Sequence, residues 1–224
     1  AVTNSFKTNL ISRGINHNKI EVITNGINPN FSKKGGLNLI DKELQKKLKS
    51  KFVVGYIGTH GLSQGLDFIV NSIKKINNEN IHFLFIGDGA QKKYLQSLAY
   101  DLNLKNLTFI NSIQRNYLPY YYDLLDISLV CLKKSKTFRT VIPSKIFEAC
   151  IMKKPILLGV EGESKELIEK YNAGLAFIPE NKIDFLDKLK IMTDKSLHVD
   201  FKNGCDELAL NFRRDYLANK MLDI

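Results

Sequence analysis

The segment from Pro143 to Glu148 carries residue types that could bind a phosphorylated sugar. Ser144 is expected to open a helix, and the first backbone N–H groups and partial positive charge of a helix suit a phosphate. Lys145 adds a mobile cation at that end, and Glu148 could accept hydrogen bonds from sugar hydroxyls one turn further on. We therefore predict a site for a nucleotide-linked sugar. A capped helix with its lysine and glutamate in solvent is the alternative.

A glycine-rich run at residues 58–65 (GTHGLSQG) is a second candidate for anion binding. Glycines let the backbone approach an anion closely, and a helix expected from Gly65 could hold phosphate. The run is neither a Walker A loop nor a GxGxxG fingerprint, which disfavours ATP and NAD. His60 could carry a proton or contact a sugar. A plain turn is the alternative for the run, and a hydrogen-bonding bystander is the alternative for His60.

Two further loops carry charged residues. Residues 133–143 are basic and follow an apolar run, so this loop could close over an anionic ligand or simply be solvated. Glu161 and Glu163 could meet ligand hydroxyls. Capping of the following helix fits better, because negative charge is favourable at a helix N-terminus.

The apolar pattern predicts the scaffold for these candidates. Continuous apolar runs such as residues 52–58 are typical of strands buried on both faces of a parallel sheet. Apolar residues at helical spacing indicate helices between the runs. The expected strands are 19–23, 52–58, 81–86, 107–110, 127–132, 155–160 and 175–178. The expected helices are 66–76, 94–102, 114–125, 144–152, 163–171, 182–193 and 202–222, with a linker and a Lys-rich helix within 32–50.

Strand–helix alternation of this kind predicts an α/β fold with a doubly wound, Rossmann-like parallel sheet and right-handed crossovers. In such sheets ligands bind beyond the carboxyl ends of the strands. The loops expected at that edge are 58–65, 87–90, 111–115, 133–143 and 161–164. The candidate residues should therefore gather there.

Composition narrows the classes of function. A net charge of +10 attracts nucleic acid, anionic lipid or phosphorylated substrate, but the lysines are scattered and no nucleic-acid-binding fingerprint is present. An AT-rich genome would also enrich Lys, Asn and Ile together. No apolar run reaches the length that spans a bilayer. Three cysteines without CxxC spacing indicate buried thiols of a cytosolic protein, and not disulfides or metal ligands: Cys131, Cys150 and Cys205.

Taken in order, these pieces resemble the carboxyl-terminal half of a retaining GT-B glycosyltransferase of family 4. The similar segments are Lys19–Phe31 (the family's interdomain segment), 58–65, Phe83–Gly89, Leu107–Asp126, Pro143–Glu148 with Lys154 and Pro155, and Ala173–Leu175. Within the family the chain most resembles bacterial enzymes that transfer N-acetylated deoxyhexosamines of the fucosamine type in surface polysaccharide synthesis. This likeness rests on two sequence variants, Gln64-Gly65 and Pro143-Ser144-Lys145.

The resemblance implies roles for the matching residues. Glu148 would bind the nucleotide ribose, the backbone N–H groups of Ser144 and Lys145 would hold the diphosphate, and Gly58 and Gly61 would let their loop face the phosphates. The expected donor-binding set is Gly58, Thr59, Gly61, Gln64, Arg139, Pro143, Ser144, Lys145 and Glu148, with catalytic roles at His60 and Thr140.

Two departures from the family pattern matter. The family has an arginine and a lysine in the glycine-rich loop for the diphosphate, where this chain has Thr59 and Gln64. It also has a glutamate that contacts the donor sugar at the position of Thr140. The phosphate charge would then have to be met by Lys145, with Arg139 or Lys136.

The resemblance thus implies the donor-binding domain of a glycosyltransferase that moves a hexosamine-like sugar from a UDP-sugar to a lipid-linked or saccharide acceptor. No cofactor is expected besides the donor and, without an Asp-x-Asp motif, no required metal. The alternatives are a nucleotide-sugar 2-epimerase of the same architecture and a domain that holds nucleotide without chemistry.

Residues 1–31 are expected to be a remnant of an N-terminal domain with the interdomain segment, 32–200 the nucleotide-sugar-binding domain, and 201–224 a helical tail on its surface or directed towards the missing domain. Because the sequence lacks an initiating methionine, we expect a fragment, and without the acceptor half we expect it to be inactive alone. The first residues also lack the layout of a signal peptide. The expected location is the cytoplasm, either free or on the inner face of the plasma membrane, with no nucleic-acid partner.

Overall fold

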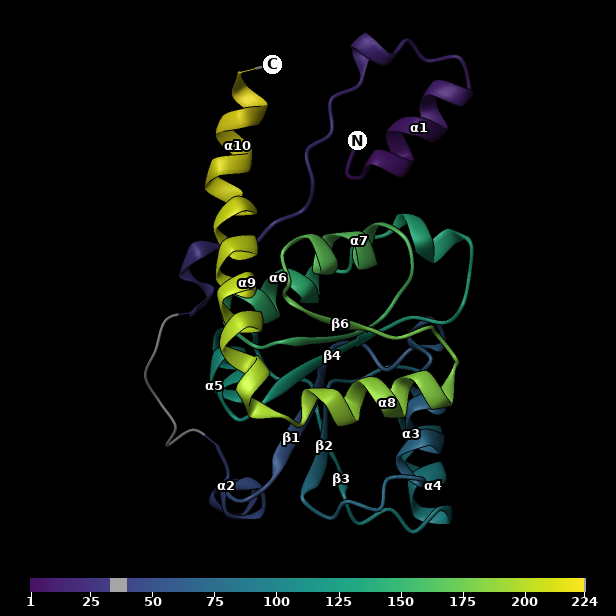
Figure 1. The fold of residues 1–224 in the computed structure, drawn as a ribbon, viewed down its shortest axis with the longest axis vertical. Coiled ribbons are helices and arrows are strands. Elements are labelled where there is room, and N and C mark those ends of the chain that lie inside the picture. The colour runs from purple at the N-terminus through teal and green to yellow at the C-terminus, as the bar shows by residue number, and fades with distance from the viewer. Residues whose placement is uncertain (33–39, 224) are drawn as a thin grey trace.

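Six parallel strands form one sheet in the computed structural model, which describes residues 1–32 and 40–223 (Figure 1). The order across the sheet is β3-β2-β1-β4-β5-β6. The strands are β1 (Phe52–Ile57), β2 (Ile81–Ile86), β3 (Leu107–Ile110), β4 (Ile127–Cys131), β5 (Ile156–Gly159) and β6 (Gly174–Ala176). The doubly wound, Rossmann-like fold predicted from the sequence is confirmed.

Helices cover both faces of the sheet. One face carries α3 (Leu66–Ile73), α4 (Lys92–Asp101) and α8 (Lys182–Met192), and the other carries α5 (Leu118–Asp123), α6 (Ser144–Ile151), α7 (Glu163–Lys170) and α9 (His198–Asn211). The remaining α-helices are α1 (Asn4–Ser12), α2 (Lys42–Leu48) and α10 (Arg214–Leu222). The polar linker expected at the start of 32–50 falls largely on residues 33–39, outside the described residues.

The two faces form two apolar clusters because alternate strand residues point to opposite sides. Val54, Tyr56 and Phe83 pack with α3, α4 and α8, whereas Val53 and Leu84 pack with the helices of the other face. All six residues of β1 and of β2 are buried. The sheet is therefore a rigid support for the loops that leave its carboxyl edge.

The strand order changes direction between β1 and β4. Connections through α3 and α4 lead from β1 outward to β3, and the chain then returns to β4 on the other side of β1. The carboxyl ends of β1 and β4 meet at this topological switch point, which is where open α/β sheets bind their ligands.

One expectation about the chain ends is wrong. Residues 20–23 form no ladder strand, because their neighbours are the terminal segments: the Ile23 N–H donates to the Ala1 carbonyl oxygen at 2.9 Å, and Ile27 forms an isolated parallel bridge with Arg213. The tail is helical, and its first helix, α9, begins at His198 and packs on the domain by burying Phe201, Cys205 and Leu208. By contrast, α10 buries none of its residues and extends beyond the sheet on the same side as α1 (Figure 1).

Glu163 stabilises the starts of two helices. It lies in the first turn of α7, where its charge is favourable as predicted, and its carboxylate oxygens also accept the backbone N–H groups of Asn4 and Ser5 in the first turn of α1. A side chain that follows β5 therefore fixes a helix 158 residues earlier in the sequence. The predicted free, buried thiols are found at all three cysteines.

Candidate active site

Two loops meet beyond the switch point, one after β1 and one after β4. The Lys133 N–H donates to the Ser63 carbonyl oxygen at 2.8 Å, which joins the glycine-rich run to the basic loop. Gly65 has φ +61, and a Cβ there would lie 3.3 Å from Lys133 Cγ. The sequence therefore needs glycine where the two loops touch. The predicted convergence of the loops 58–65 and 133–143 is confirmed.

Lys145 reaches from the first turn of α6 across the switch point to β1. Its Nζ donates to Tyr56 Oη at 2.9 Å and lies 4.0 Å from the centre of the Tyr56 ring. The Tyr56 hydroxyl in turn donates to the Thr59 carbonyl oxygen at 2.7 Å. Burial lowers the pKa of Lys145 to about 8, and the neighbouring Cys131 and Glu148 act in the opposite direction. Lys145 is thus a positioned cation whose charge is only partly offset.

Gly58 makes room for this cation. Its φ is +145, and a Cβ at that position would lie 2.8 Å from Lys145 Nζ. The Gly58 backbone also touches Gly87, where a Cβ would lie 1.9 Å from the Gly58 carbonyl oxygen. In this structure the missing side chain of Gly58 therefore admits Lys145, a role that the sequence did not indicate.

The first turn of α6 is open to an anion. Ser144 is exposed and Pro143, the N-cap residue, provides no side-chain hydrogen bond. Within the described residues the backbone N–H groups of Ser144 and Lys145 find no acceptor. The predicted helix start at Ser144 is therefore present, with unpaired donors beside the Lys145 ammonium that could receive an anion.

Glu148 lies one turn further along α6 and is paired. Its Oε1 accepts from Arg115 Nη2 at 3.3 Å, with the Glu148 side chain 17% exposed and the Arg115 side chain 60% exposed. Burial raises the pKa of Glu148, while Arg115 and Lys145 oppose the shift. Arg115 also lies 5.8 Å from the ring centre of Phe31. A polar ligand group could exchange for the solvent-exposed Arg115 on this carboxylate.

His60 is enclosed, and this corrects its predicted catalytic role. The residue has 0% of its surface exposed, and its ring packs among Tyr56, Phe85 and Phe109 with centroid separations of 5.8–6.3 Å. Neither ring nitrogen has a hydrogen-bond partner among the described residues. Burial, reinforced by the charge of Lys92, lowers the pKa of His60 to about 4. A neutral, covered imidazole cannot contact a bound sugar in this structure.

The remaining predicted residues lie around the same edge with local hydrogen bonds. Gln64 Oε1 accepts the Gly61 N–H at 3.1 Å, so both residues brace the glycine-rich run. The Thr140 hydroxyl donates to the Thr137 carbonyl oxygen at 2.8 Å. Thr59 and Arg139 are exposed. Within the ranges that the structure describes, no group of three His, Cys, Asp or Glu residues could hold a metal ion.

Lys92 was missed, although its position gave a signal. It lies on the buried face of α4 at helical spacing with Leu95 and Ala99. Its ammonium donates to the carbonyl oxygens of Gly87 at 2.8 Å and Ile110 at 3.2 Å, and to Asn111 Oδ1 at 2.6 Å. Lys92 therefore ties together the carboxyl ends of β2 and β3, which support the glycine-rich run.

The fold is that of GT-B glycosyltransferases. The structure is similar to the crystal structure of Anabaena HepE in complex with UDP, with a TM-score of 0.84 and 17% sequence identity, covering 100% of this chain and 62% of that chain. Residues 39–205 match the family described as glycosyl transferases group 1, and the chain belongs to this family.

The curated relatives include bacterial proteins, one of them from a cps region. The chain is 27% identical over 137 residues to the probable glycosyltransferase WbjE of Pseudomonas aeruginosa, covering 60% of this chain and 34% of that protein. It is 24% identical over 220 residues to an uncharacterized 41.2 kDa protein in the cps region of Klebsiella pneumoniae, covering 96% of this chain and 57% of that protein. The chain therefore spans between about a third and somewhat over half of these relatives' length. In the part of the chain that the structure describes, no helix is both long and apolar enough to cross a bilayer.

Proposed function

We propose that the chain is the donor-binding part of a retaining glycosyltransferase of family 4. The whole enzyme would move an N-acetylated hexosamine from a UDP-sugar to a lipid-linked or saccharide acceptor in surface polysaccharide synthesis. The observation that carries this proposal is the arrangement on α6: the unpaired N–H groups of its first turn, the Lys145 ammonium and the Glu148 carboxylate all lie at the switch point. Such a row matches the order of diphosphate and ribose in a nucleotide-sugar.

In this proposal Lys145 and the α6 N–H groups hold the donor diphosphate. Bond cleavage at the anomeric carbon leaves negative charge on that diphosphate, and fixed donors stabilise it most where water is excluded. Glu148 accepts hydrogen bonds from ribose hydroxyls in exchange for Arg115, which is released to solvent or to a phosphate oxygen. The protein thus contributes electrostatics and orientation.

Lys145 compensates for the two cations that the glycine-rich loop lacks. Gln64 is held inside its own loop by Gly61, and Thr59 is exposed but uncharged. Neither supplies positive charge, so we assign the main diphosphate cation to Lys145, with Arg139 as an exposed second cation. The UDP bound in HepE supports the choice of nucleotide, and the relatives' loci support the pathway class.

A domain that binds nucleotide without chemistry remains the second candidate. The observation in its favour is Thr140, which stands where the family has a sugar-contacting glutamate. Calorimetry with UDP, GDP and ADP tests the shared step, donor binding. We expect UDP to bind at one site and more tightly than the other two nucleotides. The absence of binding by all three would contradict the proposal.

A further inference from the structure

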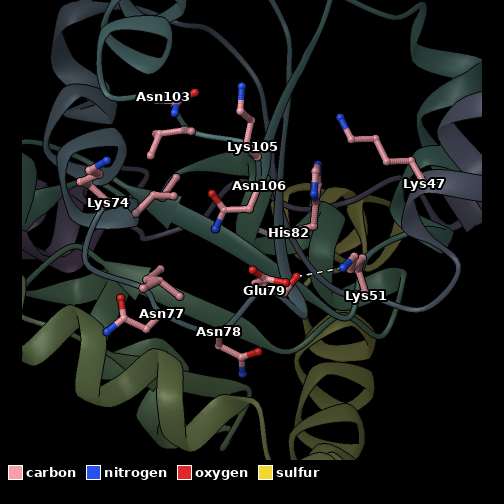
Figure 2. A pocket seen from close by; sticks show the side chains of 13 residues that line it. Lys47, Lys51, Lys74, Asn77, Asn78, Glu79, His82, Asn103, Lys105 and Asn106 are labelled. Carbon is pink, nitrogen blue, oxygen red and sulfur yellow. Dashed lines mark hydrogen bonds between the residues drawn. The ribbon is translucent and has the colours of Figure 1, made fainter.

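A basic pocket of about 610 Å³ opens at the amino edge of the sheet, the edge opposite the candidate active site. It lies between the C-terminal ends of α2 and α3 and the segments that enter β1, β2 and β3. Its charged and imidazole side chains are Lys47, Lys51, Lys74, Lys105, Glu79 and His82. In Figure 2, Lys74 and Lys47 stand on opposite sides of the pocket, with Lys105 and His82 between them.

Three of these lysines are held in place. Lys51 Nζ donates to the Glu79 carbonyl oxygen at 3.0 Å, and Lys74 Nζ donates to the Leu102 carbonyl oxygen at 2.9 Å. Lys47 Nζ donates to Thr108 Oγ1 at 2.9 Å. An ammonium has three donor hydrogens, so each keeps donors for a ligand after its position is fixed. Anchoring of this kind reduces the entropy lost on binding.

His82 forms a polar but uncharged part of the wall. The residue is 2% exposed, and its Nε2 lies 2.9 Å from the Thr108 hydroxyl. Because that hydroxyl accepts from Lys47, its own hydrogen is available to His82 Nε2, which leaves the ring proton on Nδ1. Burial lowers the pKa of His82 to about 4, and the charges of Lys47 and Lys51 lower it further in the same direction.

The charge balance favours an anion. Four lysines face a single carboxylate, Glu79, among the residues that line the pocket. The C-terminal ends of α3 and α4 carry partial negative charge, which opposes an anion, and Lys74 offsets it at the end of α4. Lys74 needs only one N–H donor to bond the end of α4, so the remaining unbonded ammonium hydrogens of the four lysines are available to an anion.

We propose that this pocket binds a phosphate group through Lys47, Lys51, Lys74 and Lys105. Separate ammonium groups around a hollow suit a multiply charged anion with several oxygens, whereas a lone carboxylate pairs best with the planar fork of arginine. The phosphate can come from a free phosphorylated solute or from an anionic lipid headgroup. The site is independent of the donor site, which lies beyond the other end of the strands.

Inorganic pyrophosphate is the probe for the free source, titrated while the His82 ring signals are followed by NMR. The titration is repeated in Lys145→Met, which weakens the donor site, so that a signal arising from that site can be recognised. We expect a saturable shift of the His82 signals, and binding about 25-fold weaker in the double variant Lys47→Gln/Lys105→Gln, at about fivefold for each lysine removed. The matched control is Lys182→Gln/Lys220→Gln, which loses the same charge at exposed positions elsewhere.

Vesicles of phosphatidylcholine with and without phosphatidylglycerol test the lipid source. Binding to the anionic vesicles alone, lost in Lys47→Gln/Lys105→Gln and displaced by pyrophosphate, assigns the pocket to a headgroup. Binding of pyrophosphate without vesicle binding assigns it to a solute. The proposal is overturned if neither probe binds, if the His82 signals stay unmoved, or if the control variant weakens binding as much as the pocket variant.

Discussion

Replacing Lys145 by methionine should weaken UDP binding and stabilise the fold at the same time. Methionine keeps much of the side-chain length but removes the charge. A hydrogen bond to a charged group contributes about 1.5–3 kcal/mol, so UDP affinity should fall by about 10- to 150-fold. The stability gain follows from burial of the ammonium beside Tyr56, which lowers its pKa from 10.5 to about 8.

The sign of the stability effect follows from proton uptake. Below pH 8 Lys145 is charged in both the folded and the unfolded state, and the folded state carries the full penalty of burying that charge. Between about pH 8 and 10.5 the unfolded chain binds more protons, so wild-type stability rises with pH. One pKa unit corresponds to about 1.4 kcal/mol. Since the side chain is partly exposed, we expect Lys145→Met to gain about 1–3 kcal/mol at pH 7.

The pH dependence of UDP binding gives a second magnitude. With a pKa of about 8, the free protein has Lys145 mostly charged at pH 7 and about one-tenth charged at pH 9. UDP affinity should therefore fall about tenfold over this range, in which a phosphate ester is already fully ionised. The groups that face Lys145 are Tyr56, Cys131, His60 and Glu148.

Calorimetry from pH 7 to 9 and urea denaturation measure these effects. Tyr56→Phe is the matched variant, because it removes the oxygen that holds Lys145, together with the hydrogen bond of that hydroxyl to the Thr59 carbonyl oxygen. Tyr56→Phe should weaken UDP binding less than Lys145→Met does. It should also move the pH at which the UDP affinity changes. Equal UDP affinity in wild type and Lys145→Met would refute the assignment of the cation. If Lys145→Met weakens UDP binding but the wild-type UDP affinity does not change from pH 7 to 9, the lowered pKa of Lys145 has no role in binding.

Three further changes test neighbouring parts of the site. Glu148→Ala should weaken UDP by about tenfold but leave a 2′,3′-dideoxy analogue unaffected in calorimetry, and an equal loss for both ligands would remove the ribose assignment. His60→Leu should keep UDP affinity within about twofold and change the free energy of unfolding by no more than about 1 kcal/mol, because no hydrogen bond is lost; a tenfold loss of affinity would restore a direct role for His60. Lys92→Met should lower the free energy of unfolding by about 1–3 kcal/mol in urea denaturation, since the buried Gly87 carbonyl oxygen and two partly exposed acceptors lose their donor, and an unchanged midpoint would contradict its bracing role.

Much of the fold could be predicted because the signals are local. The apolar runs of β2 and β3 match the structure to the residue, and the periodicity of α3 and α8 gave both helices with ends shifted by one to three residues. The positions of Lys145 and Glu148 could also be predicted from local signals, because their spacing within one helix places both on the switch-point side. Short-range periodicity contains this information directly.

What failed depends on contacts between distant segments. Residues 19–23 carry strand-like side chains, but no strand lies beside them. His60 resembles a loop residue, yet the fold turns its ring into an aromatic cluster. The pairing of Arg115 with Glu148 joins the segment after β3 to α6, and the two residues are 33 positions apart in sequence. Lys92 is different, because its place on the apolar face of α4 was visible in the sequence and could have indicated a buried, bonded cation.

A crystal structure of this chain with UDP tests the central claim most directly. The account predicts a diphosphate oxygen within hydrogen-bond distance of Lys145 Nζ and of the first N–H groups of α6, with the ribose hydroxyls on Glu148. UDP bound elsewhere, for instance in the amino-edge pocket lined by Lys47 and Lys105, with no density beside Lys145, would contradict it.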